Sequence, residues 1–106
     1  MANRVLVISW DGATFDILDP LISQGHLPFL AQRMTNGAKS RLRSCIPHVS
    51  AAAWASFQTR KNPGKHGVFD YLSYVQGQYE PKIVDSSFVN RETMWELLSQ
   101  AGKRSI

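Results

Sequence analysis

The first residues suited to chemistry are Asp11-Gly12, which directly follow an aliphatic run at residues 4–10. In open parallel sheets, ligands bind beyond the carboxyl ends of the strands, so a carboxylate at this position could ligate a metal ion. The glycine would let the chain turn away without a side chain crowding the ion. The same pattern is also typical of a turn or a helix cap, so Asp11 alone does not separate these interpretations.

The second candidate is Ser50, within the segment PHVSAAAW at residues 47–54. One interpretation is a serine N-cap of the alanine-rich helix that follows, and the local pattern favours it. The other is a nucleophile, because amide donors at a helix N-terminus attract phosphate and a nearby divalent cation would favour the alkoxide. The run of alanines would leave room for a substrate and a metal.

Other motifs that bind phosphate or metals do not fit the sequence. The segment Asn62-Pro63-Gly64-Lys65 resembles the end of a P-loop, but the glycine expected five residues before Gly64 is Thr59. No serine lies in a Gly-x-Ser-x-Gly motif. The histidines lack metal-motif spacing with Cys45 or with one another; they are His26, His48 and His66.

The chain has 106 residues and a formal charge of +4, which would suit an anionic ligand. Its basic residues are spread along the sequence, and the densest group, Lys39–Arg43, alternates like the polar face of a strand. A solvated strand face explains that group better than a nucleic-acid surface. We therefore expect no nucleic-acid partner, and a small phosphorylated substrate accounts for the charge equally well.

The single cysteine, Cys45, excludes an intramolecular disulfide and favours no oxidising compartment. The apolar run Val5–Ile8 is too short for a signal peptide or a membrane span. These features predict a cytoplasmic protein without a membrane partner.

Two strands are expected. Residues 4–10 form a continuous aliphatic run, typical of a central strand of a parallel sheet that is buried on both faces. Residues 39–46 form the second, ended by Pro47. Weak alternation at 71–75 and 79–84, with Gly77 between them, predicts a hairpin or edge strands.

Four helices are also expected, and residues 61–67 read as a loop. The first helix begins at Asp19-Pro20 and closes at Gly25. The second begins at Pro28 and ends in a left-handed cap at Asn36-Gly37. The third spans 50–59, and the fourth runs from an Asn90 cap to residue 101. Together the elements predict one partial α/β domain over residues 1–106.

Three segments, in order, resemble one known family. They are VLVISWDGATFD, LPFLAQRMTNGAKSRLRSCIPHVSAAAWASFQTRKNPGKHGVFDY and ETMWELLSQAGKR, and they cover nearly the whole chain. This order is similar to the opening of type I phosphodiesterase/nucleotide pyrophosphatase-like proteins, which belong to the alkaline phosphatase superfamily. The resemblance implies the N-terminal portion of an α/β sandwich with a mainly parallel central sheet.

The resemblance also implies a chemistry, metal-dependent hydrolysis of phosphate mono- or diesters. The family's site holds two divalent ions, usually zinc and sometimes manganese. Asp11 then corresponds to the metal ligand that follows the first strand. Ser50 corresponds to the nucleophile that attacks phosphorus and is itself a metal ligand.

The sequence departs from the family pattern at two positions. Ala53 stands where nucleotide pyrophosphatases carry an asparagine that donates to a phosphate oxygen. Arg60 stands where a glycine usually precedes the Asn-Pro-Gly stretch. The first departure argues against strict specificity for nucleotide diesters.

The family's other metal ligands lie far downstream of the region that this chain resembles. One carboxylate and one hydroxyl cannot hold two zinc ions, each of which takes about four ligands. We therefore expect the chain to be an inactive N-terminal fragment, whose partner would be the missing C-terminal portion. The alternative is a non-catalytic α/β module that binds anions or other partners.

Overall fold

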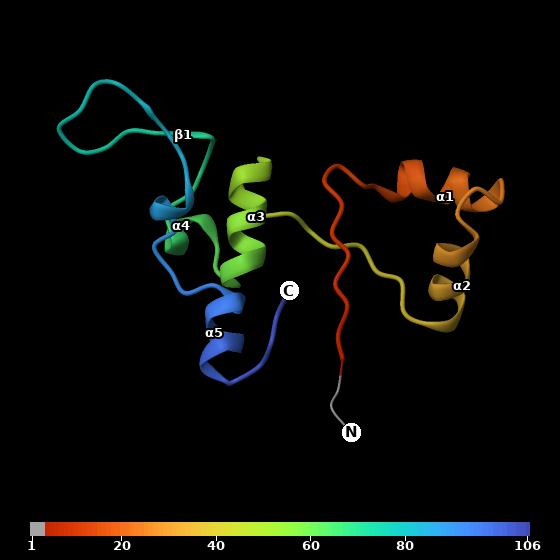
Figure 1. The fold of residues 1–106 in the computed structure, drawn as a ribbon. Coiled ribbons are helices and arrows are strands. Elements are labelled where there is room, and N and C mark those ends of the chain that lie inside the picture. The colour runs from red at the N-terminus through yellow and green to blue at the C-terminus, as the bar shows by residue number, and fades with distance from the viewer. Residues whose placement is uncertain (1–3) are drawn as a thin grey trace. The chain divides into compact units, whose positions relative to one another are not determined.

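The computed structural model describes residues 4–106, which form two compact units divided after Leu42 (Figure 1). Helices and one small antiparallel sheet make up the described part of the chain, a mixed content compatible with the predicted α/β class. None of the described helices is long and apolar enough to cross a membrane.

The first unit contains two helices, α1 (Phe15–Ser23) and α2 (Pro28–Asn36). Helix α1 begins earlier than predicted, because Thr14 is the N-cap and its side chain accepts a hydrogen bond from the Asp16 amide. The predicted start at Asp19-Pro20 is therefore wrong, and Pro20 lies inside the helix. Its missing N–H removes one backbone bond of the helix.

Helix α2 begins at Pro28, as predicted, but its cap differs. Gly37 has φ −129° and ψ −147°, which is extended backbone rather than the predicted left-handed conformation. Glycine is needed there for another reason. A Cβ at this position would lie 2.8 Å from the Arg33 carbonyl oxygen, closer than real Cβ contacts allow.

The predicted strands at 4–10 and 39–46 are not formed; both ranges lie outside any sheet in the described structure. A strand exists only where its backbone groups pair with a neighbour, and the described residues offer these ranges no such neighbour. The first run is instead exposed, with Val5 at 84% and Leu6 at 83%. The expected burial on both faces is thus absent from this structure.

The second unit begins with α3 (Ser50–Thr59), whose bounds match the predicted helix. It is followed by α4 (Pro63–His66) in the range predicted as a loop. The predicted hairpin is confirmed as β1 (Leu72–Ser73) paired antiparallel with β2 (Lys82–Ile83). A short 3₁₀ helix, η1 (Ser86–Phe88), and α5 (Met94–Gln100) complete the unit.

All residues classed as buried among those described lie in this second unit. Three helical residues of α3 contribute, together with Pro63, His66 and Val68 from the segment that follows. Ala52 and His66 are both 0% exposed. The small side chains of α3 let this segment pack closely against the helix, so the unit is organised around α3.

Helix α5 is capped by Thr93 rather than by the predicted Asn90. The Thr93 side chain accepts from the Glu96 amide, and the Glu96 carboxylate accepts from the Thr93 amide at 2.6 Å. This reciprocal pair is a capping box, which outcompetes a lone asparagine three residues earlier. Asn90 instead donates its backbone N–H to the His66 carbonyl at 3.0 Å.

Candidate functional site

Asp11 lies in a turn directly after the exposed run, in the first unit. Gly12 has φ +68°, a left-handed conformation that glycine adopts without steric cost. The chain therefore does turn sharply at this point, as the motif predicted. Asp11 itself is exposed.

Ser50 is the first residue of α3, in the second unit. The N-cap position is held by Val49, with φ −120° and ψ 137°, so the interpretation of Ser50 as an N-cap is wrong. Val49 also accepts the first intrahelical bond, from the Ala53 amide at 2.9 Å. Ser50 thus lies at the end of the helix where amide donors are exposed to an anion.

The alanines after Ser50 divide between two roles. Ala51 and Ala53 are half-buried, whereas Ala52 is fully buried in the core of the unit. The expectation that the whole run leaves room for a substrate is therefore too broad. Ala53 is the position where the family pattern would place an amide donor, and it offers none.

The two predicted site residues belong to different units, so the structure gives no joint geometry for them. Within residues 4–106, no group of three or more His, Cys, Asp or Glu side chains is placed to hold a metal ion. A divalent ion such as Zn²⁺ takes about four ligands in proteins. The described residues therefore do not by themselves make the predicted binuclear centre.

A Ser–His contact that the sequence analysis did not identify joins α3 to α4. The Ser56 hydroxyl and His66 Nε2 are 2.9 Å apart, and His66 Nδ1 accepts from the Val68 amide at 3.1 Å. Because the Val68 N–H can only donate, Nδ1 carries no proton and Nε2 is the protonated nitrogen. Burial also lowers the pKa of His66 and so favours the neutral ring.

The direction of this hydrogen bond is the opposite of the one that would activate Ser56 as a nucleophile. A general base must accept a proton from the serine hydroxyl, whereas His66 donates to Ser56. The pair is therefore structural, and Ser56 is not a second nucleophile. The only signal in the sequence is a histidine in a Gly- and Pro-rich loop, which does not indicate burial.

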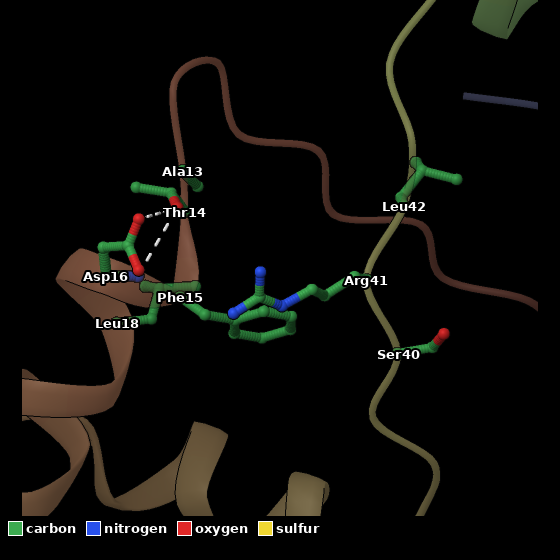
Figure 2. Close-up of a pocket in the computed structure, with 8 residues that line it drawn as sticks. All are labelled: Ala13, Thr14, Phe15, Asp16, Leu18, Ser40, Arg41 and Leu42. Carbon is green, nitrogen blue, oxygen red and sulfur yellow. Dashed lines mark hydrogen bonds between the residues drawn. The ribbon is translucent and has the colours of Figure 1, made fainter.

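A hollow of about 430 Å³ lies in the first unit, shortly after Asp11 in the sequence (Figure 2). Arg41 reaches across it beside the Phe15 ring, and Asp16 lies at its edge with Thr14. The nearby Lys39 is paired with Asp19 at 2.6 Å and lies over the Phe15 ring at 4.3 Å. The lining residues are Ala13, Thr14, Phe15, Asp16, Leu18, Ser40, Arg41 and Leu42.

Arg41 gives this hollow one cation, which could pair with an anionic group. Asp16 contributes an opposite charge to the lining, so the hollow is not uniformly basic. The Lys39–Arg43 group therefore does not form the even polar strand face that the sequence predicted. Lys39 is used within the unit, while Arg41 lines the hollow.

A second hollow, of about 350 Å³, lies within the second unit beside α3. Ala51 and Ala55 line it from the helix, together with Trp54 and Tyr71. Valines from three later positions complete a largely apolar wall, at Val68, Val84 and Val89. It begins one residue after Ser50, but its lining offers no cation for a phosphate.

The family model described as type I phosphodiesterase / nucleotide pyrophosphatase matches residues 5–106, which include both Asp11 and Ser50. No curated protein and no solved structure matched the chain.

Proposed function

This chain belongs to the type I phosphodiesterase / nucleotide pyrophosphatase family, and on this premise we propose that it carries the nucleophile and one metal ligand of a phosphoester hydrolase. The family supports hydrolysis of the phosphodiester type. The proposal adds that Ser50 attacks phosphorus and that Asp11 and Ser50 are metal ligands. Its substrate would be a small phosphorylated molecule, either a mono- or a diester.

The position of Ser50 at the start of α3 is the observation that supports the proposal most directly. In the proposed step, a bond forms between the serine oxygen and phosphorus, and the bond from phosphorus to the leaving oxygen breaks. The serine hydroxyl gives up its proton and the leaving oxygen takes one up. Water later attacks phosphorus, the bond from phosphorus to the Ser50 oxygen breaks, and that oxygen is protonated again. Amides of the first turn of α3 would stabilise charge on the phosphoryl oxygens.

The proposed activity depends on two divalent ions, zinc or manganese. The described residues do not supply a complete set of ligands for these ions. The remaining ligands would come from residues beyond those described. We propose accordingly that the 106-residue chain by itself is inactive. The proposal also places the protein in the cytoplasm.

The proposal extends to the fold. In a complete catalytic domain, residues 4–10 and 39–46 would become strands of a mainly parallel sheet in an alkaline-phosphatase-like sandwich. Asp11 would then follow the carboxyl end of the first strand, where α/β proteins bind their ligands. The aliphatic character and exposure of Val5–Ile8 support this part of the proposal, because such a run is stabilised by neighbours on both sides.

The test begins with the coding DNA after the Ile106 codon. If it continues and encodes Asp and His clusters, the longer product should hydrolyse an aryl phosphate mono- or diester with Zn²⁺ or Mn²⁺. Ser50→Ala should then lower kcat by at least about 10³-fold, as removal of a nucleophile does. Ser56→Ala is the matched control and should retain activity, because its hydroxyl is a structural partner of His66.

The 106-residue chain should show no turnover above background in the same assay. Robust turnover by this chain that Ser50→Ala abolishes would overturn the proposed inactivity. If a stop codon follows Ile106 and no ligand clusters are encoded nearby, the alternative of a non-catalytic anion-binding module gains weight. Arg41, in the hollow of the first unit, is the residue that favours this alternative.

A further inference from the structure

His66 lies at the centre of the second unit and connects three parts of it. Its side chain is 0% exposed. The ring contacts Ser56 on α3 and the Val68 amide, and its carbonyl accepts from the Asn90 amide at 3.0 Å. One residue therefore links α3, the turn after α4 and the segment that leads to α5.

Both ring nitrogens are occupied in a way that only the neutral ring permits. Nδ1 accepts from the Val68 N–H, while Nε2 donates to the Ser56 hydroxyl. A second proton on the ring would have to sit on Nδ1. It would then face the Val68 N–H, so two donors would oppose each other across 3.1 Å.

The elements around His66 provide no carboxylate to stabilise a charged ring. Helix α3 contains no titratable side chain, and neither does the segment 86–90. The cations nearest in sequence are exposed and would repel an imidazolium; they are Arg60, Lys61, Lys65 and Arg91. The carboxylates of the neighbouring segments accept hydrogen bonds elsewhere, Asp70 from Tyr71, Asp85 from Ser87 and Glu96 from Thr93.

We propose that His66 is a pH-sensitive contact. At neutral pH its neutral ring holds α3 against residues 62–68 and Asn90, and in mild acid its protonation releases these segments. Protonation breaks the contact with Val68 and turns the ring toward water. The segment then separates from α3, the helix that carries Ser50. The proposal concerns packing within one unit and does not depend on the hydrolase chemistry.

The direction of the effect follows from linkage. Burial lowers the pKa of His66 below its ordinary value of 6.5, so the unfolded chain binds the proton more tightly. The contribution of His66 to the free energy of unfolding is therefore complete above pH 6.5 and is lost as the pH falls. Asp85 and Glu96 have lowered pKa values too, but they lose stability only in stronger acid. Between pH 7 and pH 5, His66 therefore dominates the expected change in stability.

The experiment measures denaturant unfolding of the chain across that interval, with His66→Gln as the variant. In wild type, the unfolding equilibrium constant should rise by up to about tenfold per pH unit below 6.5, which corresponds to one proton. Gln can donate to Ser56 but does not titrate, so the dependence should be nearly flat. His48→Gln is the control and should behave as wild type, because His48 is exposed.

A second measurement decides the question even if His66→Gln does not fold. Nitrogen-15 NMR of the wild-type rings should show His66 as the Nε2–H tautomer at pH 7. It should stay neutral as the pH falls below 6.5, until the second unit opens. Titration of His66 at an ordinary pKa without loss of structure, or an Nδ1–H tautomer, would overturn the proposal.

Discussion

Arg60 adopts a backbone conformation that is costly for its residue type. It follows the last residue of α3 with φ +58° and ψ +25°, the left-handed region that usually requires glycine. This is the position where the family pattern has glycine. The local geometry of that pattern is thus kept here although the residue is not.

We predict that Arg60→Gly stabilises the second unit by about 0.5–1 kcal/mol. The left-handed conformation costs a non-glycine residue about 1–2 kcal/mol, from which the greater entropy of glycine in the unfolded chain subtracts about 0.5–1 kcal/mol. Thermal or denaturant unfolding measures the change. Arg60→Ala is the control, since it removes the side chain and keeps the strain. An equal gain from both variants would contradict the explanation.

Ser50 and Ser56 show at the residue scale how one amino-acid type takes different roles on one helix. Ser50 begins α3, whereas Ser56 lies two turns later and contacts a buried histidine. The sequence pattern identified the first and gave no indication of the second. Of these two serines, Ser50 is the one at the helix N-terminus, where the proposed attack on phosphorus would take place.

Helix α5 depends on its capping box more than on any buried side chain. None of its residues is fully buried, and Trp95 and Leu98 are 44% and 37% exposed. A short helix with so little burial gains much of its stability at its ends. The Thr93–Glu96 pair satisfies amide donors of the first turn.

We predict that Thr93→Ala destabilises the chain by about 1 kcal/mol, the usual cost of losing an N-cap side chain. Circular dichroism and denaturant unfolding would report the loss of helix and of stability. Asn90→Ala is the matched control, because Asn90 contributes its backbone N–H rather than a cap. A larger loss of stability from Asn90→Ala than from Thr93→Ala would contradict this assignment and support Asn90 as the N-cap of the helix.

At the scale of the whole molecule, the apolar run near the N-terminus is exposed over several consecutive residues. Val7, Ile8 and Trp10 are 58%, 64% and 55% exposed, and no neighbouring strand in the described chain covers them. An uncovered apolar run with unpaired backbone groups tends to associate with other chains.

We predict that the chain self-associates as its concentration rises and that Val7→Lys reduces this association. A charge within an apolar run opposes pairing of the backbone with another copy. Sedimentation velocity at several concentrations would measure the effect. Gln78→Lys adds the same charge in the hairpin loop and should leave the association unchanged. A wild-type chain that stays monomeric at high concentration would contradict the prediction.

The sequence by itself determined the family, the positions of Asp11 and Ser50, the bounds of α3 and the hairpin around Gly77. The helix and the hairpin depend on local chemistry, because helix propensity and turn residues act over a few neighbouring residues. The family follows instead from the order of motifs along nearly the whole chain. Capping was less predictable, since Thr14 and Thr93 compete with nearby Asp19 and Asn90 for the same role.

The tertiary structure decided which of these features were realised. Residues 4–10 carry a strand pattern, but pairing requires a partner that no local signal supplies. The burial of His66 and its contacts with Ser56 and Val68 depend on how α4 packs against α3. Local sequence therefore specified the candidate chemistry, while packing between distant residues determined its surroundings, because burial and strand pairing are properties of neighbours in space.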